Sequence, residues 1–254
     1  FLKGFRKQFS GSYEDSLERI ESLLTQSVHG QMLSDVPLGA FLSGGIDSSV
    51  VSALMQSVSM NPIKTFSIGF DEPGYNEAIF AKDVATHLGT DHTELYVSSN
   101  TAMNIIPKLS QIFSEPFADS SQIPTFLVSE LARQNVTVGL SGDGGDEVFC
   151  GYNRYRFTYN MWPKIQYIPP NFRSVIARSI NRFSPNTWDR FSKVMGQPHF
   201  GEKMHKMALA MISSTVDDLY RKLTSQWHNP ESVVLGGNDS RRLSLSEHDS
   251  IKTL

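Results

Sequence analysis

The chain has 254 residues, of which 39% are hydrophobic and 19% charged, and its formal net charge is −3. This length suits one large domain or a domain with a smaller appendage, and the composition is that of a soluble globular protein. The weak negative charge gives no reason to expect nucleic acid or a membrane surface as a partner. Cys150 is the only cysteine, which excludes an internal disulfide and a cysteine zinc cluster.

The sequence also leads to expectations about the cellular compartment and about the ends of the chain. A single cysteine fits a reducing cytoplasm. No apolar run reaches the ~20 residues that span a bilayer, and the chain starts at Phe1 without a signal peptide. We therefore expect a cytoplasmic protein and a segment excised from a longer chain.

Hydrophobic spacing predicts alternating helices and strands over the first 140 residues. Helices are expected over residues 14–33, 48–58, 76–88, 101–112 and 122–134, and strands over 38–42, 64–70, 92–97 and 136–140. In the second strand Phe66, Ile68 and Phe70 are expected on one face, and Gly89 is expected to close the helix over 76–88. This alternation predicts a parallel sheet covered on both faces. From about residue 152 the pattern changes to an aromatic cluster and several prolines, without a convincing strand. The rest of the chain is therefore predicted to be helical.

The most informative segment is the turn Ser43-Gly44-Gly45-Ile46-Asp47-Ser48-Ser49, which joins a strand to a helix. Main-chain N–H groups and the helix dipole favour an anion at such a turn, and glycines let a phosphate approach the backbone. Asp47 would repel a phosphate unless a cation lay between them. The loop therefore predicts a phosphate bound together with Mg²⁺.

Two other phosphate-binding loops do not fit this turn. Gly39 and Gly44 match the first half of the Walker pattern, but Gly45 stands where that pattern needs Lys. The dinucleotide G-x-G-x-x-G spacing also fails. A purely structural strand-to-helix turn is the remaining alternative.

A second glycine loop, Ser141-Gly142-Asp143-Gly144-Gly145-Asp146-Glu147, follows the strand at 136–140. Ligands gather at the carboxyl ends of parallel strands, so both loops can face one site. Asp47 and Asp146 then make a pair for Mg²⁺ and pyrophosphate. A calcium-binding loop is excluded by spacing, and a solvated acidic turn is the alternative.

Together these segments resemble the synthetase domain of glutamine-hydrolysing asparagine synthetase. The resemblance covers about residues 14–156 and rests on both loops, on Asp35-Val36-Pro37-Leu38-Gly39 and on Val148-Phe149-x-Gly151-Tyr152. S-G-G-x-D-S alone marks the wider ATP pyrophosphatase superfamily. The implied architecture is α/β, a parallel-sheet adenine nucleotide alpha hydrolase-like (ATP pyrophosphatase) fold with a helical C-terminal appendage. It divides the chain into a synthetase domain over 1–159 and a truncated helical continuation over 160–254.

The resemblance also implies a reaction and its partners. The family uses ATP and Mg²⁺ to convert aspartate into asparagine through β-aspartyl-AMP, with release of AMP and pyrophosphate. Ammonia would come from a glutaminase domain of the parent chain, and the resemblance leaves a homodimer open. Two alternatives are a relative that amidates another carboxylate, of the β-lactam or polysaccharide type, and a non-catalytic ATP-binding module.

The family's site residues transfer onto matching positions. Asp47 and Asp146 are the expected metal ligands, and with Asp143 they are the expected catalytic residues. Asp143 stands where the family commonly has Glu, which is one methylene longer. The expected nucleotide-binding residues are Leu42, Ser43, Gly44, Gly45, Asp47, Ser48, Ile68, Ser141 and Gly142.

Two features depart from the family pattern. No match to the family's later Lys-bearing segment is found before Leu254, so nucleotide binding is better supported than full turnover. Lys203, Lys206 and Lys222 are expected to be solvated surface residues. Cys150 is expected to be a small buried residue without a catalytic role.

Overall fold

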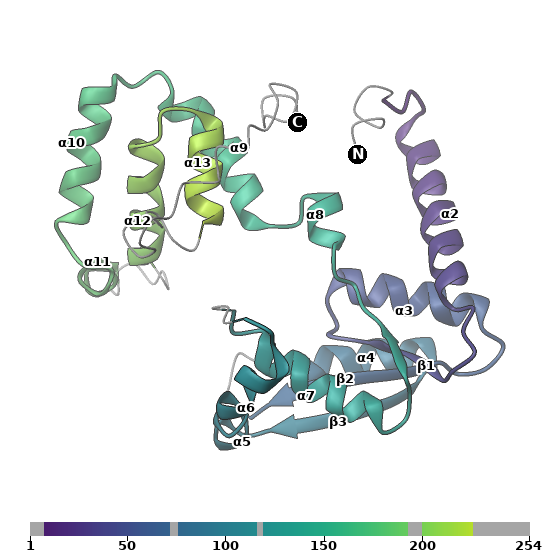
Figure 1. Cartoon of the computed structure of the whole chain (residues 1–254). Helices are drawn as coiled ribbons and strands as arrows, with labels where there is room; N and C mark the ends of the chain where they lie inside the picture. Colours follow the sequence, from purple (N-terminus) through teal and green to yellow (C-terminus); the bar gives the residue numbers. More distant parts are fainter. Residues whose placement is uncertain (1–7, 72–75, 116–118, 193–199, 226–254) are drawn as a thin grey trace. The chain divides into compact units, whose positions relative to one another are not determined.

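The computed structural model of the chain describes residues 8–71, 76–115, 119–192 and 200–225 (Figure 1). The chain divides into two compact units, Phe1–Gly145 and Asp146–Leu254, and each is described separately. This division precedes the predicted domain boundary at residue 159, and the predicted domain assignment stays a prediction. The sequence also predicts a loop over residues 233–239, and this stretch lies outside the described residues.

The first unit is built on a four-stranded parallel sheet in the order β3-β2-β1-β4. Neighbouring strands stay in register from Gly39 opposite Lys64 and from Leu38 opposite Val138. Because β1 has β2 on one side and β4 on the other, the direction of the connections reverses between β1 and β4. The strands are β1 (Leu38–Phe41), β2 (Lys64–Phe70), β3 (Asp91–Val97) and β4 (Val138–Leu140).

Helices cover both faces of this sheet, as the alternating pattern predicted (Figure 1). Helices α3 and α4 pack on one face, and α7 packs on the other. The helices of this unit are α2 (Tyr13–Gln31), α3 (Ile46–Val58), α4 (Ala78–Leu88), α5 (Ser99–Met103), α6 (Ile106–Ile112) and α7 (Gln122–Arg133). The predicted fold class is therefore confirmed for the sheet and its helical layers.

Strand β2 shows why the sheet has two different faces. Phe66 is buried against α7 residues, and Ile68 and Phe70 pack in the neighbouring cluster on that side. Thr65 and Ser67 are buried on the opposite face. This two-residue alternation is the one that the sequence predicted for Phe66, Ile68 and Phe70.

One predicted helix is wrong in its extent. Residues 101–112 form two short helices, α5 and α6, instead of one continuous helix. Pro107 lies in the first turn of α6, where its missing N–H costs no hydrogen bond. A continuous helix would place that proline in its interior, so the chain ends one helix at Met103 and begins another. By contrast, α4 ends at Leu88 and is capped by Gly89 as predicted, with a left-handed φ of 70° at the glycine.

The second unit contains only helices among its described residues. Helix α8 (Gly145–Phe149) spans the division between the units. The others are α9 (Asn153–Ile165), α10 (Pro170–Asn181), α11 (Pro185–Ser192), α12 (Phe200–Met211) and α13 (Val216–Thr224). This confirms the predicted helical character up to Thr224, and residues 226–254 lie outside the described part.

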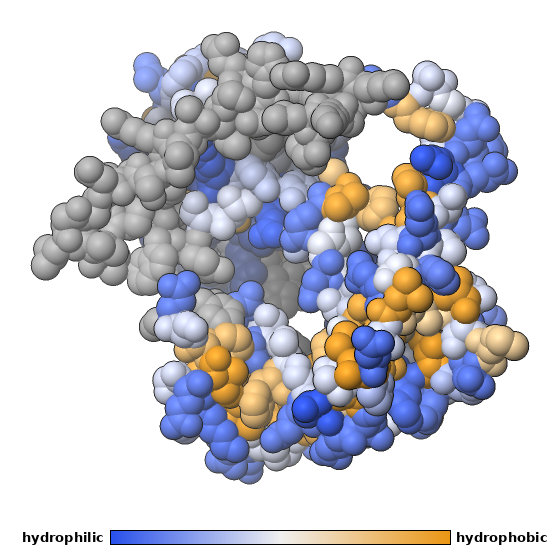
Figure 2. Space-filling view, turned by 45° about the vertical axis from the view of Figure 1, so that its right-hand side comes forward, coloured by the Kyte–Doolittle hydropathy of each residue, from blue (hydrophilic) through white to orange (hydrophobic). Residues whose placement is uncertain are grey.

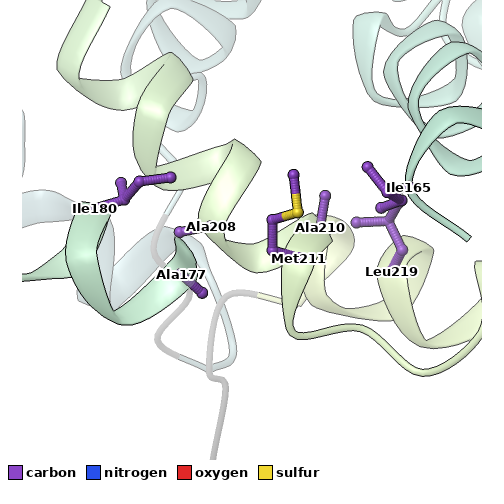
Figure 3. Packing of buried hydrophobic residues seen from close by; sticks show 7 residues of the cluster. All are labelled: Ile165, Ala177, Ile180, Ala208, Ala210, Met211 and Leu219. Carbon is purple, nitrogen blue, oxygen red and sulfur yellow. The ribbon is translucent and has the colours of Figure 1, made fainter. Parts of the chain in front are cut away.

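The core of the second unit joins four of its helices. Figure 3 shows Ala177 beside Ala208, where small side chains let α10 and α12 approach closely. Ile165 of α9 and Leu219 of α13 belong to the same buried cluster. Arg173 is buried beside this core, and its Nη1 donates to the main-chain oxygen of Ser213 at 2.9 Å. The hydrogen bond of Arg173 therefore links α10 to the segment after α12.

The surface mixes polar and apolar residues. Figure 2 shows hydrophobic patches scattered among hydrophilic side chains on the face that it draws. In α2, Val28 is buried, whereas Tyr13 and Leu17 nearer the start of the helix are exposed. None of the described helices combines the length and apolarity that crossing a bilayer requires.

A buried polar network on the sheet predicts a pH dependence of stability. His92 bridges two strands, with Nδ1 2.8 Å from Thr65 Oγ1 and Nε2 3.1 Å from Ser67 Oγ. Burial lowers the pKa of His92, and the nearby Lys82 adds to this effect while Glu94 opposes it. The folded chain therefore favours neutral His92. In the unfolded chain the imidazole takes up a proton near pH 6.5, whereas in the folded chain it does so only at lower pH. The stability of the folded state is therefore expected to fall as pH drops from about 6.5 through the folded pKa.

We expect His92→Asn to reduce the fall in thermal midpoint between pH 7.5 and 5, because the variant has no imidazole to protonate. Thermal melts across this range measure the slope, and His87→Asn, at an exposed position on α4, controls for the loss of one histidine. An unchanged slope in His92→Asn would contradict the assignment.

Candidate functional site

The two glycine loops leave neighbouring strands at the same edge of the sheet. The first loop follows β1, and the second follows β4, its hydrogen-bonded neighbour. The carboxyl ends of β1 and β4 flank the point where the strand order reverses, and open α/β sheets bind ligands at such a switch point. The sequence prediction that both loops face one site is therefore supported by the topology.

Leu42 anchors the beginning of the first loop. Its N–H donates to the Phe66 main-chain oxygen at 2.9 Å, which extends the β1–β2 pairing by one residue. Its side chain is buried against Ala81 and Ala85 of α4. The loop therefore starts from a fixed point on the sheet.

Hydroxyl groups hold the turn itself. Ser48 Oγ accepts from the Ser43 N–H at 3.2 Å and lies 3.0 Å from Ser43 Oγ. Ser43 Oγ also accepts from the Gly45 N–H at 3.2 Å. Gly45 is the N-cap of α3 and provides no side chain to cap the first turn. The dipole and main-chain donors of α3 are thus presented by a turn that its own serines make rigid.

Gly44 is required for reasons beyond a close approach to phosphate. Its φ is +78°, a left-handed conformation that favours glycine. A Cβ at this position would lie 2.6 Å from Phe80 Cβ and 2.7 Å from the Ala81 main-chain nitrogen. The absent side chain therefore lets the loop pack on the start of α4.

The second loop packs directly on the first. A Cβ on Gly142 would lie 2.7 Å from the Ser48 main-chain nitrogen and 3.0 Å from Asp47 Cβ. A Cβ on Gly145 would collide with the Asp47 carboxyl group. The two loops therefore meet at the first turn of α3, with the Asp47 side chain against the second loop.

The second loop has its own internal hydrogen bonds. Ser141 Oγ donates to Asp143 Oδ2 at 2.9 Å and accepts from the Asp143 N–H at 3.4 Å. The Gly145 N–H donates to the Gly142 oxygen at 3.2 Å. Asp143 is exposed, so its carboxylate is accessible as well as oriented by Ser141.

Ile68 and Asp146 are placed differently from the other candidate residues. Continuing the register from Phe41 opposite Phe66 puts Ile68 level with Ser43, while its side chain packs in the core on the α7 side. Only its main chain lies at the sheet edge on that register. Asp146 belongs to the second unit, where its main-chain oxygen accepts from the Gly151 N–H at 3.0 Å.

A cavity of about 750 Å³ opens beside the first loop. It lies at the carboxyl ends of β2 and β3 and at the start of α4. Sequence reasoning missed most of its wall, although the end of β2 next to a helix start was a usable signal. The lining residues are Ser43, Gly44, Gly45, Phe70, Asp71, Asn76, Glu77, Ile79, Phe80 and Tyr96.

Tyr96 in this wall is held by a hydrogen bond to Glu94, which also forms an ion pair with Lys82. Burial opposes ionisation of Glu94, but hydrogen bonds from Lys82 and Tyr96 outweigh it and lower the pKa of Glu94. Lys82 Nζ lies 3.2 Å from Glu94 Oε1, and Tyr96 Oη donates to Glu94 Oε2 at 3.0 Å. The hydrogen bond to Glu94 raises the pKa of Tyr96, so the phenol stays neutral near pH 7.

The comparisons with known proteins fit this geometry. The asparagine synthase family matches residues 19–252. Asparagine synthetase (glutamine-hydrolyzing) 1 of Bacillus subtilis is 39% identical over 164 residues, which are 64% of this chain and 26% of the relative. A putative asparagine synthetase (glutamine-hydrolyzing) 2 of Methanocaldococcus jannaschii is 47% identical over 146 residues, 57% of this chain and 28% of the relative. Asparagine synthetase B of Escherichia coli is 31% identical over 151 residues, 52% of this chain and 26% of the relative.

The parallel sheet and its paired glycine loops define a PP-loop ATP pyrophosphatase fold. The chain belongs to the asparagine synthase family, which confirms the resemblance inferred from the loops. It spans about a quarter of the length of the curated relatives that it matches.

The packing of Gly44 predicts a large effect of one methyl group. Gly44→Ala combines a left-handed φ, worth about 1–2 kcal/mol, with a collision against α4 that adds about 1–3 kcal/mol. Gly89→Ala is the matched control, because its φ is 70° and open space surrounds the added methyl group. Urea denaturation should show a larger loss of stability in Gly44→Ala, and equal losses would refute the packing argument.

Proposed function

We propose that this chain carries out the ATP-dependent, amide-forming chemistry of an asparagine synthetase. The observation that supports this most is the meeting of two glycine loops at the first turn of α3, with Asp47 against the second loop. The curated relatives are named asparagine synthetases (glutamine-hydrolyzing). The substrates, the ammonia source and the assembly are proposed on the same basis.

ATP is proposed to lie across the carboxyl edge of the sheet. The first turn of α3 would receive its phosphates, since Gly45 leaves that turn without a side-chain cap. The main chain of Ile68 and the buried Leu42 would support the nucleoside part, because both lie level with the start of the loop. The other proposed contacts are Ser43, Gly44, Gly45, Asp47, Ser48, Ser141 and Gly142.

The residues present fit a Mg²⁺ ion that arrives with the nucleotide. Among the residues that the structure describes, no three His, Cys, Asp or Glu side chains form a metal-binding group. Mg²⁺ commonly uses only one or two carboxylates, with waters and substrate phosphates completing its shell. Asp47 and Asp146 are proposed as those carboxylates, and the bound ion would neutralise the charge of the departing pyrophosphate.

The proposed reaction has two steps. The side-chain carboxylate of aspartate attacks the α-phosphorus of ATP, which forms β-aspartyl-AMP and releases pyrophosphate. Ammonia then attacks the activated carbonyl, giving asparagine and AMP. The N–H groups of α3 would stabilise phosphate charge as it develops. Asp143, held by Ser141, is proposed to orient the reacting carboxylate or ammonia.

A product assay tests this function. AMP and pyrophosphate release from ATP and Mg²⁺ is measured with ammonium, with and without L-aspartate. We expect aspartate-dependent release together with asparagine. Release that depends on a different carboxylic acid would point to a related amidating enzyme. Nucleotide binding without release would point to a non-catalytic module.

Removing one charge tests the metal assignment. Asp47→Asn is expected to weaken Mg²⁺-dependent ATP binding at least tenfold, or about 1.4 kcal/mol, because the amide is a poorer ligand than the carboxylate. Asp83→Asn, at an exposed position on α4, is the control. Calorimetric titration of Mg²⁺–ATP measures both, and equal affinities would remove Asp47 from the metal site.

A further inference from the structure

The wall of the cavity beside the first loop combines apolar surface with hydrogen-bond acceptors. Ile79 and Phe80, on the first turn of α4, line the cavity and are exposed, although both side chains are hydrophobic. Asp71 and Glu77 add carboxylates, and no Lys, Arg or His is among the described residues that line the cavity. Such a wall suits a ligand group that is partly apolar and carries N–H and O–H donors.

The ring of Tyr96 is a fixed part of this wall. Tyr96 lies opposite Gly69 in the β2–β3 register, and a Cβ on Gly69 would lie 2.7 Å from Tyr96 Cε1. The same Cβ would lie 3.0 Å from the Cβ of Ala78 in α4. The glycine therefore leaves room for the Tyr96 ring on β2, beside the start of α4. The ring is 49% exposed, so part of it remains free to contact a ligand.

Glu94 holds the hydroxyl end of that ring. Glu94 and Tyr96 are two residues apart on β3, so their side chains lie on the same face of the strand. Glu94 Oε2 accepts from Tyr96 Oη at 3.0 Å, whereas Glu94 Oε1 lies 3.2 Å from Lys82 Nζ. Each carboxylate oxygen thus has its own partner, one on β3 and one on α4. The ring of Tyr96 is therefore fixed by packing on β2 and by a hydrogen bond at its hydroxyl.

The same cavity reaches the first glycine loop. Ser43, Gly44 and Gly45 line it together with Tyr96. A ligand whose phosphates lie on the first turn of α3 can therefore place its next group in the cavity. In ATP that group is the nucleoside, which has a flat base, an amino group on the base and two ribose hydroxyls.

We propose that Tyr96 contacts the nucleoside of the substrate and that Glu94 is the positioning residue that presents the Tyr96 ring to the base. The base stacks on the exposed part of this ring. The amino group and the ribose hydroxyls donate to the carboxylates of Asp71 and Glu77. This inference rests on the proposed function, in which the phosphates of ATP occupy the first loop.

Inorganic tripolyphosphate separates the two parts of this site, because it can occupy the phosphate loop but has no nucleoside. Calorimetric titration of the whole chain in Mg²⁺ should show a higher affinity for ATP than for tripolyphosphate. Tyr96→Ala is expected to weaken ATP binding about tenfold, within the range for a base stacked on an aromatic ring, and to leave tripolyphosphate binding unchanged. Tyr13→Ala, at an exposed position on α2, is the matched control.

Variants at Glu94 test the positioning role while the ring stays in place. Glu94→Gln keeps an acceptor for the phenol and should retain ATP affinity, whereas Glu94→Ala should lower it. Tyr96→Phe removes the same hydrogen bond from its other end. The double variant Glu94→Ala/Tyr96→Phe should therefore bind ATP no more weakly than the weaker single variant. A merely structural defect would lower tripolyphosphate affinity as well.

The outcomes separate this inference from the proposed function. Unchanged ATP affinity in folded Tyr96→Ala, or an equal loss of tripolyphosphate affinity, would overturn the inference and leave the proposed function intact. Additive losses in the Glu94→Ala/Tyr96→Phe double variant would overturn the positioning role, even if Tyr96→Ala did not fold. Wild-type chain that binds neither ATP nor tripolyphosphate would overturn both.

Discussion

The close contact between Gly142 and the main chain of Asp47 and Ser48 is the constraint on which the candidate site depends. It brings the loop after β4 onto the first turn of α3 without an intervening side chain. Asp47 is thereby pressed against the second loop, and the serine hydroxyls hold the first loop from within. Any side chain at position 142 would separate the two loops and open the site.

The strand order explains why these two loops meet. Placing β1 between β2 and β4 puts the ends of β1 and β4 side by side, although the second loop lies far along the chain. The same order places the cavity on the other side of the first loop, toward β2 and β3. The first loop thus belongs both to the junction with the second loop and to the cavity wall, which links the proposed phosphate region to a larger binding volume.

Much of this could be predicted from sequence, because local patterns carry it. Two-residue alternation located Phe66, Ile68 and Phe70, and Gly89 marked the end of α4. The break between α5 and α6 was missed, since hydrophobic spacing continues across it and only Pro107 signals it. Cys150 was expected to be buried, and it is exposed. This exposure and the contact of Gly44 with Phe80 depend on tertiary packing, which local sequence patterns do not predict.

The pairing of Leu38 with Val138 has a consequence for how the site comes into being. Contacts between residues so distant in sequence require a long loop to close before they return any stabilisation. Pairing β1 with β4 therefore costs more loop-closure entropy than pairing β1 with β2, and the site is complete only when that cost has been met. A ligand that bridges both loops binds only the finished fold, so its binding energy adds directly to the stability of that state.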